Sequence, residues 1–107
     1  MEFPIRAINS WYLLQLPPVI NFEVNLALKN KIEELSELDC PKIAFDVSDL
    51  SYMGSLAVGV FVFAHKLLAE HNGDFCLFSP NEVGKKIMNE TGLDNVLNLI
   101  TDLSELD

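Results

Sequence analysis

The chain has 107 residues, of which 50% are hydrophobic and 21% are charged, and its formal net charge is −9. This length and composition indicate one globular domain, residues 1–107, and exclude a disordered chain. The seven Lys and Arg residues are scattered, so no basic stripe is available for a phosphate backbone, and we expect no nucleic acid among its partners.

The first predicted element is a β-hairpin. Apolar residues alternate with polar ones over residues 3–8, and a second apolar run, 11–16, follows the Asn-Ser pair at 9–10. A short polar pair between two such runs is typical of a hairpin turn, so the runs are expected to pair antiparallel. The Pro-Pro pair at 17–18 then ends the second strand, because proline lacks the N–H that a ladder needs.

Residues 21–39 predict the first helix. Apolar residues recur there at spacings of three and four, with charged residues between them. Asn21 is placed to cap the helix N-terminus, and Pro41 lies just beyond its end. The apolar positions expected to face the core are Phe22, Leu26, Leu28, Ile32, Leu35 and Leu38.

Strands and helices alternate along the rest of the chain. The remaining predicted elements are a strand at 42–47, a helix at 55–72, a strand at 75–79, a helix at 81–92, a strand at 96–100 and one frayed turn at 101–107. The order β-β-α-β-α-β-α-β implies right-handed crossovers. The expected fold is therefore α/β, a mixed and mostly parallel β-sheet with the helices 21–39 and 55–72 packed on one side.

The helix that begins at Ser55 has two unlike faces on a helical wheel. Its apolar arc is expected to face the sheet and consists of Leu56, Ala57, Val60, Phe61, Ala64, Leu67 and Leu68. The opposite arc carries Ser55, Gly59 and Val62, with Val58 and Phe63 at its edges. Near Ser55 the exposed side is thus expected to be apolar, and Gly59 lets another backbone approach closely. This pattern predicts a contact surface with Val62 inside it.

A serine at a helix start has a structural explanation as well as a functional one. Serine is a preferred N-cap, whose side chain stabilises a helix by about 1 kcal/mol. On the functional side, several residues stand in a recognisable order. Asp46 ends an apolar strand, Ser55 and Gly59 open a helix, Gly73 marks a turn, and residues 91–93 (Thr-Gly-Leu) end the next helix. In this order residues 45–97 resemble the central block of STAS domains, the anti-sigma factor antagonist family.

The resemblance implies a regulatory binding protein switched by a kinase. It aligns Ser55 with the serine that a cognate protein kinase, itself an anti-sigma factor, phosphorylates in typical members. The sequence departs from the family pattern where Gly54 replaces an Asp, Leu56 a second Ser and Asn21 a loop Asp. The resemblance and the helical wheel together give the expected partner-binding residues, which are Asn21, Gly54, Ser55, Val58, Gly59, Val62 and Phe63.

A second use of the same fold fits the sequence too. An accessory subunit of a membrane transporter, or a module that binds a small ligand, would need no phosphorylation and would suit the missing acidic residues. A homodimer also stays open. None of these functions requires catalysis. His65 and His71 have no cysteine or carboxylate near them at the spacing of metal ligands, and no phosphate-binding loop motif occurs. We therefore expect no enzymatic activity, no metal and no cofactor.

Three features of the sequence predict where the protein is located in the cell: its first residues, its longest apolar run and its two cysteines. The start has no cationic segment followed by an apolar one, so no signal peptide is expected. The longest apolar run, 56–64, reaches about half of a membrane span, so no membrane insertion is expected. Cys40 and Cys76 are then reduced thiols of a cytoplasmic protein.

Overall fold

The computed structural model describes residues 2–107, in which the elements follow the predicted order with two short strands added. The strands are β1 (Ile5–Ile8), β2 (Trp11–Gln15), β3 (Val19–Ile20), β4 (Lys42–Asp46), β5 (Tyr52–Met53), β6 (Asp74–Phe78) and β7 (Asn98–Ile100). The helices are α1 (Phe22–Leu35), α2 (Ser55–Glu70) and α3 (Glu82–Thr91), and two 3₁₀ turns span Leu93–Asn95 and Leu103–Glu105.

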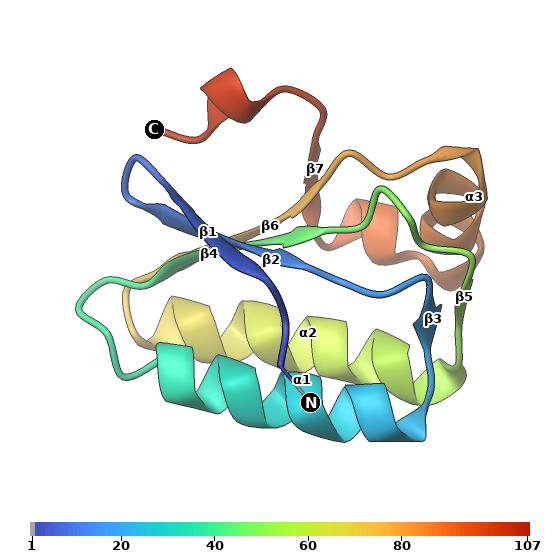
Figure 1. Ribbon diagram of the computed structural model, residues 1–107, viewed down its shortest axis with the longest axis horizontal. Helices are drawn as coiled ribbons and strands as arrows, with labels where there is room; N and C mark the ends of the chain where they lie inside the picture. Colours follow the sequence, from blue (N-terminus) through green and yellow to red (C-terminus); the bar gives the residue numbers. More distant parts are fainter. Residues whose placement is uncertain (1) are drawn as a thin grey trace.

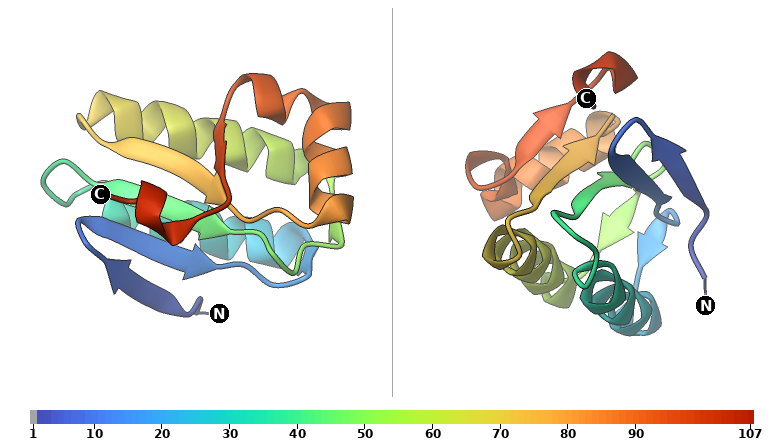
Figure 2. Two further views of the ribbon diagram at one scale, coloured as in Figure 1. Left: turned by 90° about the horizontal axis from the view of Figure 1, so that it is seen from above. Right: turned by 90° about the vertical axis from the view of Figure 1, so that its left-hand side faces the viewer.

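The main sheet has five strands in the order β1-β2-β4-β6-β7. β1 runs antiparallel to β2, and the other three pairings are parallel. α1 and α2 lie side by side beneath one face of this sheet, and α3 stands near β5 at its end (Figures 1 and 2). The predicted mixed sheet with its two helices on one side is confirmed, although these helices end earlier, at Leu35 and Glu70.

The core between sheet and helices is built around aromatic side chains. Phe45 of β4 and Phe61 of α2 are fully buried and meet edge to face, with ring centroids 5.3 Å apart. Phe75 also meets Phe45 edge to face, with ring centroids 4.7 Å apart. Edge-to-face pairs add about 0.5–1.5 kcal/mol to the free energy gained by burying the rings. This packing fixes which side of α2 faces the sheet.

α1 buries a different set of positions from the predicted one. Leu28, Ile32 and Leu35 are buried as expected. Phe22 and Leu26, however, are 69% and 53% exposed. The buried stripe starts instead at Val24 and Asn25 and continues through Leu28. At about 100° per residue, Phe22 and Leu26 fall on a different face of the helix from this stripe. Leu38, also expected inside, lies beyond the end of the helix and is 42% exposed.

The strands β3 and β5 form a separate two-stranded parallel ladder that the sequence did not predict. Val19 pairs with Tyr52, and Ile20 pairs with Met53. Just before it, the carbonyl oxygen of Pro18 accepts hydrogen bonds from the N–H groups of residues 51 and 52, at 2.8 and 3.1 Å. The ladder joins the segment that enters α1 to the segment that enters α2. It therefore sets where the two helices begin relative to each other.

The face of the sheet that α1 and α2 leave free is covered by the C-terminal segment, which crosses it in red at the top of Figure 1. Leu106 is 1% exposed and packs in a cluster that includes Trp11 and Cys76. The Trp11 indole Nε1–H donates to Asp107 Oδ1 at 2.9 Å, and Asp102 and Glu105 form a capping box. The turn predicted at 101–107 is thus capped and anchored, and the expectation that it frays is wrong.

Gly73 occupies the turn between α2 and β6 for a packing reason. A Cβ at this position would lie 2.0 Å from the carbonyl oxygen of Pro41, a contact that no side chain tolerates. The left-handed backbone conformation of this turn falls instead on Asn72, whose φ is 59°. Pro41 then accepts the N–H of Asp74 at 2.9 Å, and this bond starts β6 beside β4.

Candidate partner-docking surface

Ser55 is the first residue of α2 and is exposed. Gly54 is the N-cap, with φ −78° and ψ 173°, and a glycine has no side chain with which to bond the helix start. In the described part of the chain the Ser55 hydroxyl makes no hydrogen bond. The capping explanation for this serine is therefore wrong, and its side chain is free for another use.

A cavity of about 310 Å³ lies beside Ser55, between the starts of α1 and α2. It opens to the surface. The residues around it come from the β3–α1 and β5–α2 junctions, and none of them is charged. They are Ile20, Asn21, Phe22, Asn25, Tyr52, Gly54, Ser55 and Leu56.

Large exposed hydrophobic side chains border this cavity. Phe22 is 69%, Leu56 60% and Tyr52 55% exposed. The Tyr52 hydroxyl lies 3.6 Å from where a Cβ of residue 54 would stand, so the tyrosine leans over the start of α2. Leu56 was expected to face the sheet, and that expectation is wrong. Ala57 is the first residue of α2 whose side chain reaches the core.

Further along α2, the surface is less exposed than the helical wheel predicted. Val58, Val62 and Phe63 are half-buried and pack against the main core. The expectation that Val62 is bare is therefore wrong, because part of its side chain is covered by the main core. Lys29 of α1 reaches across to α2, with its Nζ 5.5 Å from the centre of the Phe63 ring. Gly59 is open, as expected, because no described residue outside its own stretch of helix comes within 4 Å of where a Cβ would stand.

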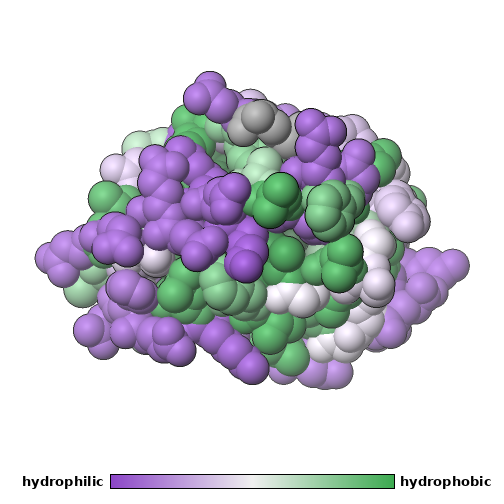
Figure 3. All heavy atoms as spheres, turned by 90° about the horizontal axis from the view of Figure 1, so that it is seen from below, coloured by the Kyte–Doolittle hydropathy of each residue, from purple (hydrophilic) through white to green (hydrophobic). Residues whose placement is uncertain are grey.

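Seen from the side of the two helices, hydrophobic side chains gather across the middle of the molecule, and hydrophilic ones crowd its left end (Figure 3). Around the cavity at the helix starts, the large exposed hydrophobic side chains are Phe22, Tyr52 and Leu56. A contiguous apolar area of this kind on a soluble domain is typical of an interaction site. We call this area, with Ser55 and the cavity beside it, the docking surface.

Two asparagines, Asn21 at the N-cap of α1 and Asn25 within the helix, line the cavity of the docking surface. The side chain of Asn21 caps the helix, accepting the Val24 N–H at 3.0 Å, as the sequence predicted. Asn25 was not predicted as a site residue. It is only 6% exposed, and within residues 2–107 its Oδ1 finds no hydrogen-bond partner. Its spacing of three and seven residues from Leu28 and Ile32 could have placed it on the buried stripe.

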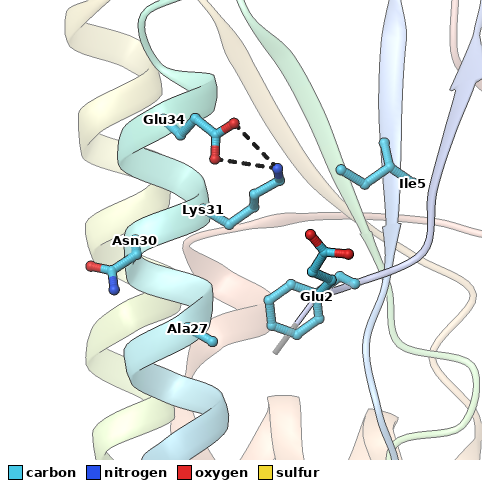
Figure 4. Close-up of a pocket in the computed structure, with 7 residues that line it drawn as sticks. Glu2, Ile5, Ala27, Asn30, Lys31 and Glu34 are labelled. Atoms are coloured by element: carbon cyan, nitrogen blue, oxygen red, sulfur yellow. Dashed lines mark hydrogen bonds and ion pairs between the residues drawn. The ribbon is translucent and has the colours of Figure 1, made fainter.

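A second cavity, of about 480 Å³, lies between the N-terminal segment and the middle of α1. Figure 4 shows Lys31 and Glu34 turned toward each other, and their side chains form an ion pair at 3.3 Å. Glu2 lines the same space, so the lysine there is already neutralised and one further carboxylate remains. These groups offer no unpaired cation to an acidic ligand, and we assign no function to this cavity.

The described residues offer few groups that could catalyse a reaction or hold a metal ion. No three His, Cys, Asp or Glu side chains lie close enough together there to hold a metal ion. His65 is half-buried on α2, whereas His71 is exposed at its end. Among the helices of residues 2–107, none has the length and apolar character needed to cross a membrane.

Comparison with known proteins identifies the family. The STAS domain model matches residues 3–106, and the chain therefore belongs to the STAS domain family. A protein of Thermotoga maritima, provisionally named an anti-sigma factor antagonist, is 28% identical over 104 residues, which are 96% of this chain and 92% of that protein. A likewise provisionally named protein of Thermotoga neapolitana gives the same identity and coverage.

Solved structures agree in fold. The crystal structure of the Thermotoga maritima protein superposes with a TM-score of 0.81 at 26% identity, covering 96% of this chain and 89% of that one. The unphosphorylated anti-sigma factor antagonist SpoIIAA gives 0.79 at 18% identity, with 99% and 94% covered. The phosphorylated form of SpoIIAA, a Bacillus cell fate determinant, gives 0.73 at 18%, with 99% and 97% covered.

Proposed function

We propose that this STAS domain is a non-enzymatic, cytoplasmic regulatory module of the anti-sigma factor antagonist type. It docks a regulatory protein, an anti-sigma factor with serine kinase activity, through the docking surface at the start of α2. The observation that carries the proposal is the Ser55 hydroxyl, which is exposed, free of any capping bond and bordered by exposed Phe22 and Leu56. The names of the Thermotoga relatives support the same class of function.

Phosphorylation of Ser55 would act as the switch. A phosphate adds about −1.5 to −2 charges. In the free domain it sits at a helix N-terminus, where a negative charge is favourable by about 0.3–1 kcal/mol. The cavity beside it is lined by uncharged residues, so no carboxylate there repels it.

In the complex the same phosphate would be trapped against Phe22 and Leu56. Removing an ion from water costs several kcal/mol unless it is paired. A cost of about 4 kcal/mol weakens binding roughly a thousandfold. Phosphorylation therefore releases the partner and leaves the domain folded. SpoIIAA, which shares the fold, has been solved in phosphorylated and unphosphorylated forms.

The test uses protein isolated from its own cell. Mass spectrometry should find phosphate on Ser55, and the isolated partner should bind wild type and Ser55→Ala alike but Ser55→Asp at least about a hundredfold more weakly. Ser104→Asp is the matched control, since Ser104 is an exposed serine in the C-terminal turn on the opposite face of the sheet. Equal affinity of wild type and Ser55→Asp, or phosphate found only elsewhere, would refute the switch.

A second candidate function is supported by the neutral docking surface. Gly54, Leu56 and Asn21 leave it without the acidic groups of typical members, and an uncharged apolar surface suits permanent assembly. The domain would then be an accessory subunit of a membrane transporter, or a module for a small ligand, without phosphorylation. Co-purification with a transport protein, and a Ser55 free of phosphate under all growth conditions, would favour it over the first.

A further inference from the structure

The C-terminal segment, residues 101–107, lies against the main sheet as a bound peptide would. It crosses the face that α1 and α2 leave free (Figure 1). Side chains alternate along a strand, so this face carries every second residue of β2, β4 and β6. Those that cluster with the segment are apolar and buried, and they are Trp11, Leu13, Ala44 and Cys76. Such a face needs a cover, because exposed apolar surface is unfavourable in water.

The groups that hold the segment recognise two consecutive residues of opposite character. Leu106 is buried in the apolar cluster that contains Trp11. The carboxylate of Asp107 accepts the Trp11 indole N–H at 2.9 Å and pairs with Lys42 Nζ at 3.4 Å. Asn9 Nδ2 donates to the main-chain carbonyl of Leu106 at 2.7 Å. The sheet thus offers an apolar contact, a cation and two side-chain N–H donors to an aliphatic residue followed by an acidic one.

The rest of the segment contributes little to this attachment. Within residues 101–105 only Leu103 is half-buried, and the other four residues are exposed. The capping box of Asp102 and Glu105 joins two parts of the segment to each other and does not tie it to the sheet. Attachment therefore depends mainly on the last two residues. A segment with so few buried contacts opens at a lower free energy than the domain as a whole.

We propose that this face of the sheet is a second docking site, which binds a segment of a partner protein with an aliphatic residue directly before an acidic one, and that residues 101–107 occupy it as an autoinhibitory contact. The chain's own segment defines the occupant, because Leu106 meets the apolar cluster and Asp107 meets the Lys42 cation. The site lies on the opposite face of the sheet from α2 (Figure 1). It is therefore distinct from the docking surface and does not rest on the proposed function.

The first experiment adds the acetylated and amidated peptide of residues 101–107 to the full chain and follows the fluorescence of Trp11, its only tryptophan. A ligand that competes with the chain's own segment binds only open molecules, so its apparent Kd is the intrinsic Kd divided by the open fraction. Leu106→Ala weakens the segment and raises that fraction about 30-fold. This variant should therefore bind the peptide about 30-fold more tightly than wild type. Leu38→Ala, at an exposed leucine, is the matched control and should bind as wild type.

The second experiment tests the chemistry of the occupant with altered peptides and the Leu106→Ala protein. A peptide with alanine in place of Leu106 should bind about 30-fold more weakly than the unaltered peptide. A peptide with asparagine in place of Asp107 should bind about 3–10-fold more weakly, because its amide oxygen carries no charge for Lys42. Adding Lys42→Gln to the protein should reduce this preference for the acidic peptide. Equal binding of all three peptides would overturn the proposal, because the site would then not recognise the pair of residues.

Two further measurements keep the outcome decisive. Asp107→Asn leaves the buried leucine of the segment in place and should still tighten binding of the unaltered peptide about threefold. Equal affinity of wild type and both segment variants would overturn the proposal, because peptide and segment would then not share a site. Sedimentation of Leu106→Ala without peptide should show a monomer. A dimer would overturn the proposal of a partner segment, because a second copy of the chain would then cover the face.

Discussion

Leu106 is the clearest single test of how the C-terminal segment is held on the sheet. Its side chain is 1% exposed and packs in one cluster with Trp11, Leu13, Ala44 and Cys76. Leu106→Ala removes three carbon groups from this contact, and at about 0.8 kcal/mol for each the loss is about 2 kcal/mol. This is the low end for Leu→Ala in a core, because a surface segment can settle into the gap.

This loss of packing free energy first makes it easier for the C-terminal segment to detach locally from the sheet. About 2 kcal/mol corresponds to about a 30-fold larger fraction of molecules with the C-terminal segment detached. Cys76 lies beneath it at 3% exposure, and burial raises the pKa of its thiol to about 12, with the charges of Glu105 and Asp74 adding to the effect. In the closed state the thiol is therefore both covered and protonated, and it should react slowly.

The assay follows thiol labelling of Cys76 at neutral pH. The measurements are made in a Cys40→Ser background, because Cys40 is exposed and would react first. Leu106→Ala should raise the labelling rate about 30-fold. Leu38→Ala, at a leucine that is 42% exposed, should leave the rate unchanged. An unchanged rate in Leu106→Ala would refute the reasoning, because the segment would then not be what shields Cys76.

Three other outcomes are expected. The hydrogen bond from the Trp11 indole lowers the pKa of Asp107. The stabilisation of the fold by this bond is therefore present above the unfolded pKa near 3.8 and is lost as pH falls through the lower pKa of the folded state. Asp107→Asn should remove this acid dependence from Trp11 fluorescence. Phe61→Ala should cost about 3–5 kcal/mol in denaturant unfolding, because the ring is fully buried. Leu56→Asp should weaken partner binding yet change the free energy of unfolding by no more than about 0.5 kcal/mol, because Leu56 is exposed. Val62 is half-buried, so Val62→Asp should lower both the affinity for the partner and the free energy of unfolding.

The fold could be predicted because its signals are long. Strand and helix runs of five or more residues set the order of the main elements, and prolines and glycines marked their ends. The β3–β5 ladder escaped prediction because each strand has two residues, too few for any alternation to appear. The anchoring of the C-terminal segment also escaped, since Leu106 is buried by strands far from it in the sequence.

The exposure of the residues around Ser55 was predicted only in part. Ser55 and Gly59 are exposed as expected. The helical wheel, however, took no account of the elements that pack against α2. Val62 is half-buried against the main core, and the core begins only at Ala57, which leaves Leu56 outside. Asn25 could not be assigned from the sequence, because its unpaired oxygen is a property of the folded surroundings.

The β3–β5 ladder has a consequence for how partners could change over evolution. It fixes the two helix starts through main-chain hydrogen bonds, which depend little on the side chains present. The outward side chains Val19 and Tyr52 are 46% and 55% exposed and can be exchanged without moving the frame that carries them. The frame that carries the two helix starts and the side chains displayed on it are thereby separated, so that this part of the surface can change by substitution without loss of the fold.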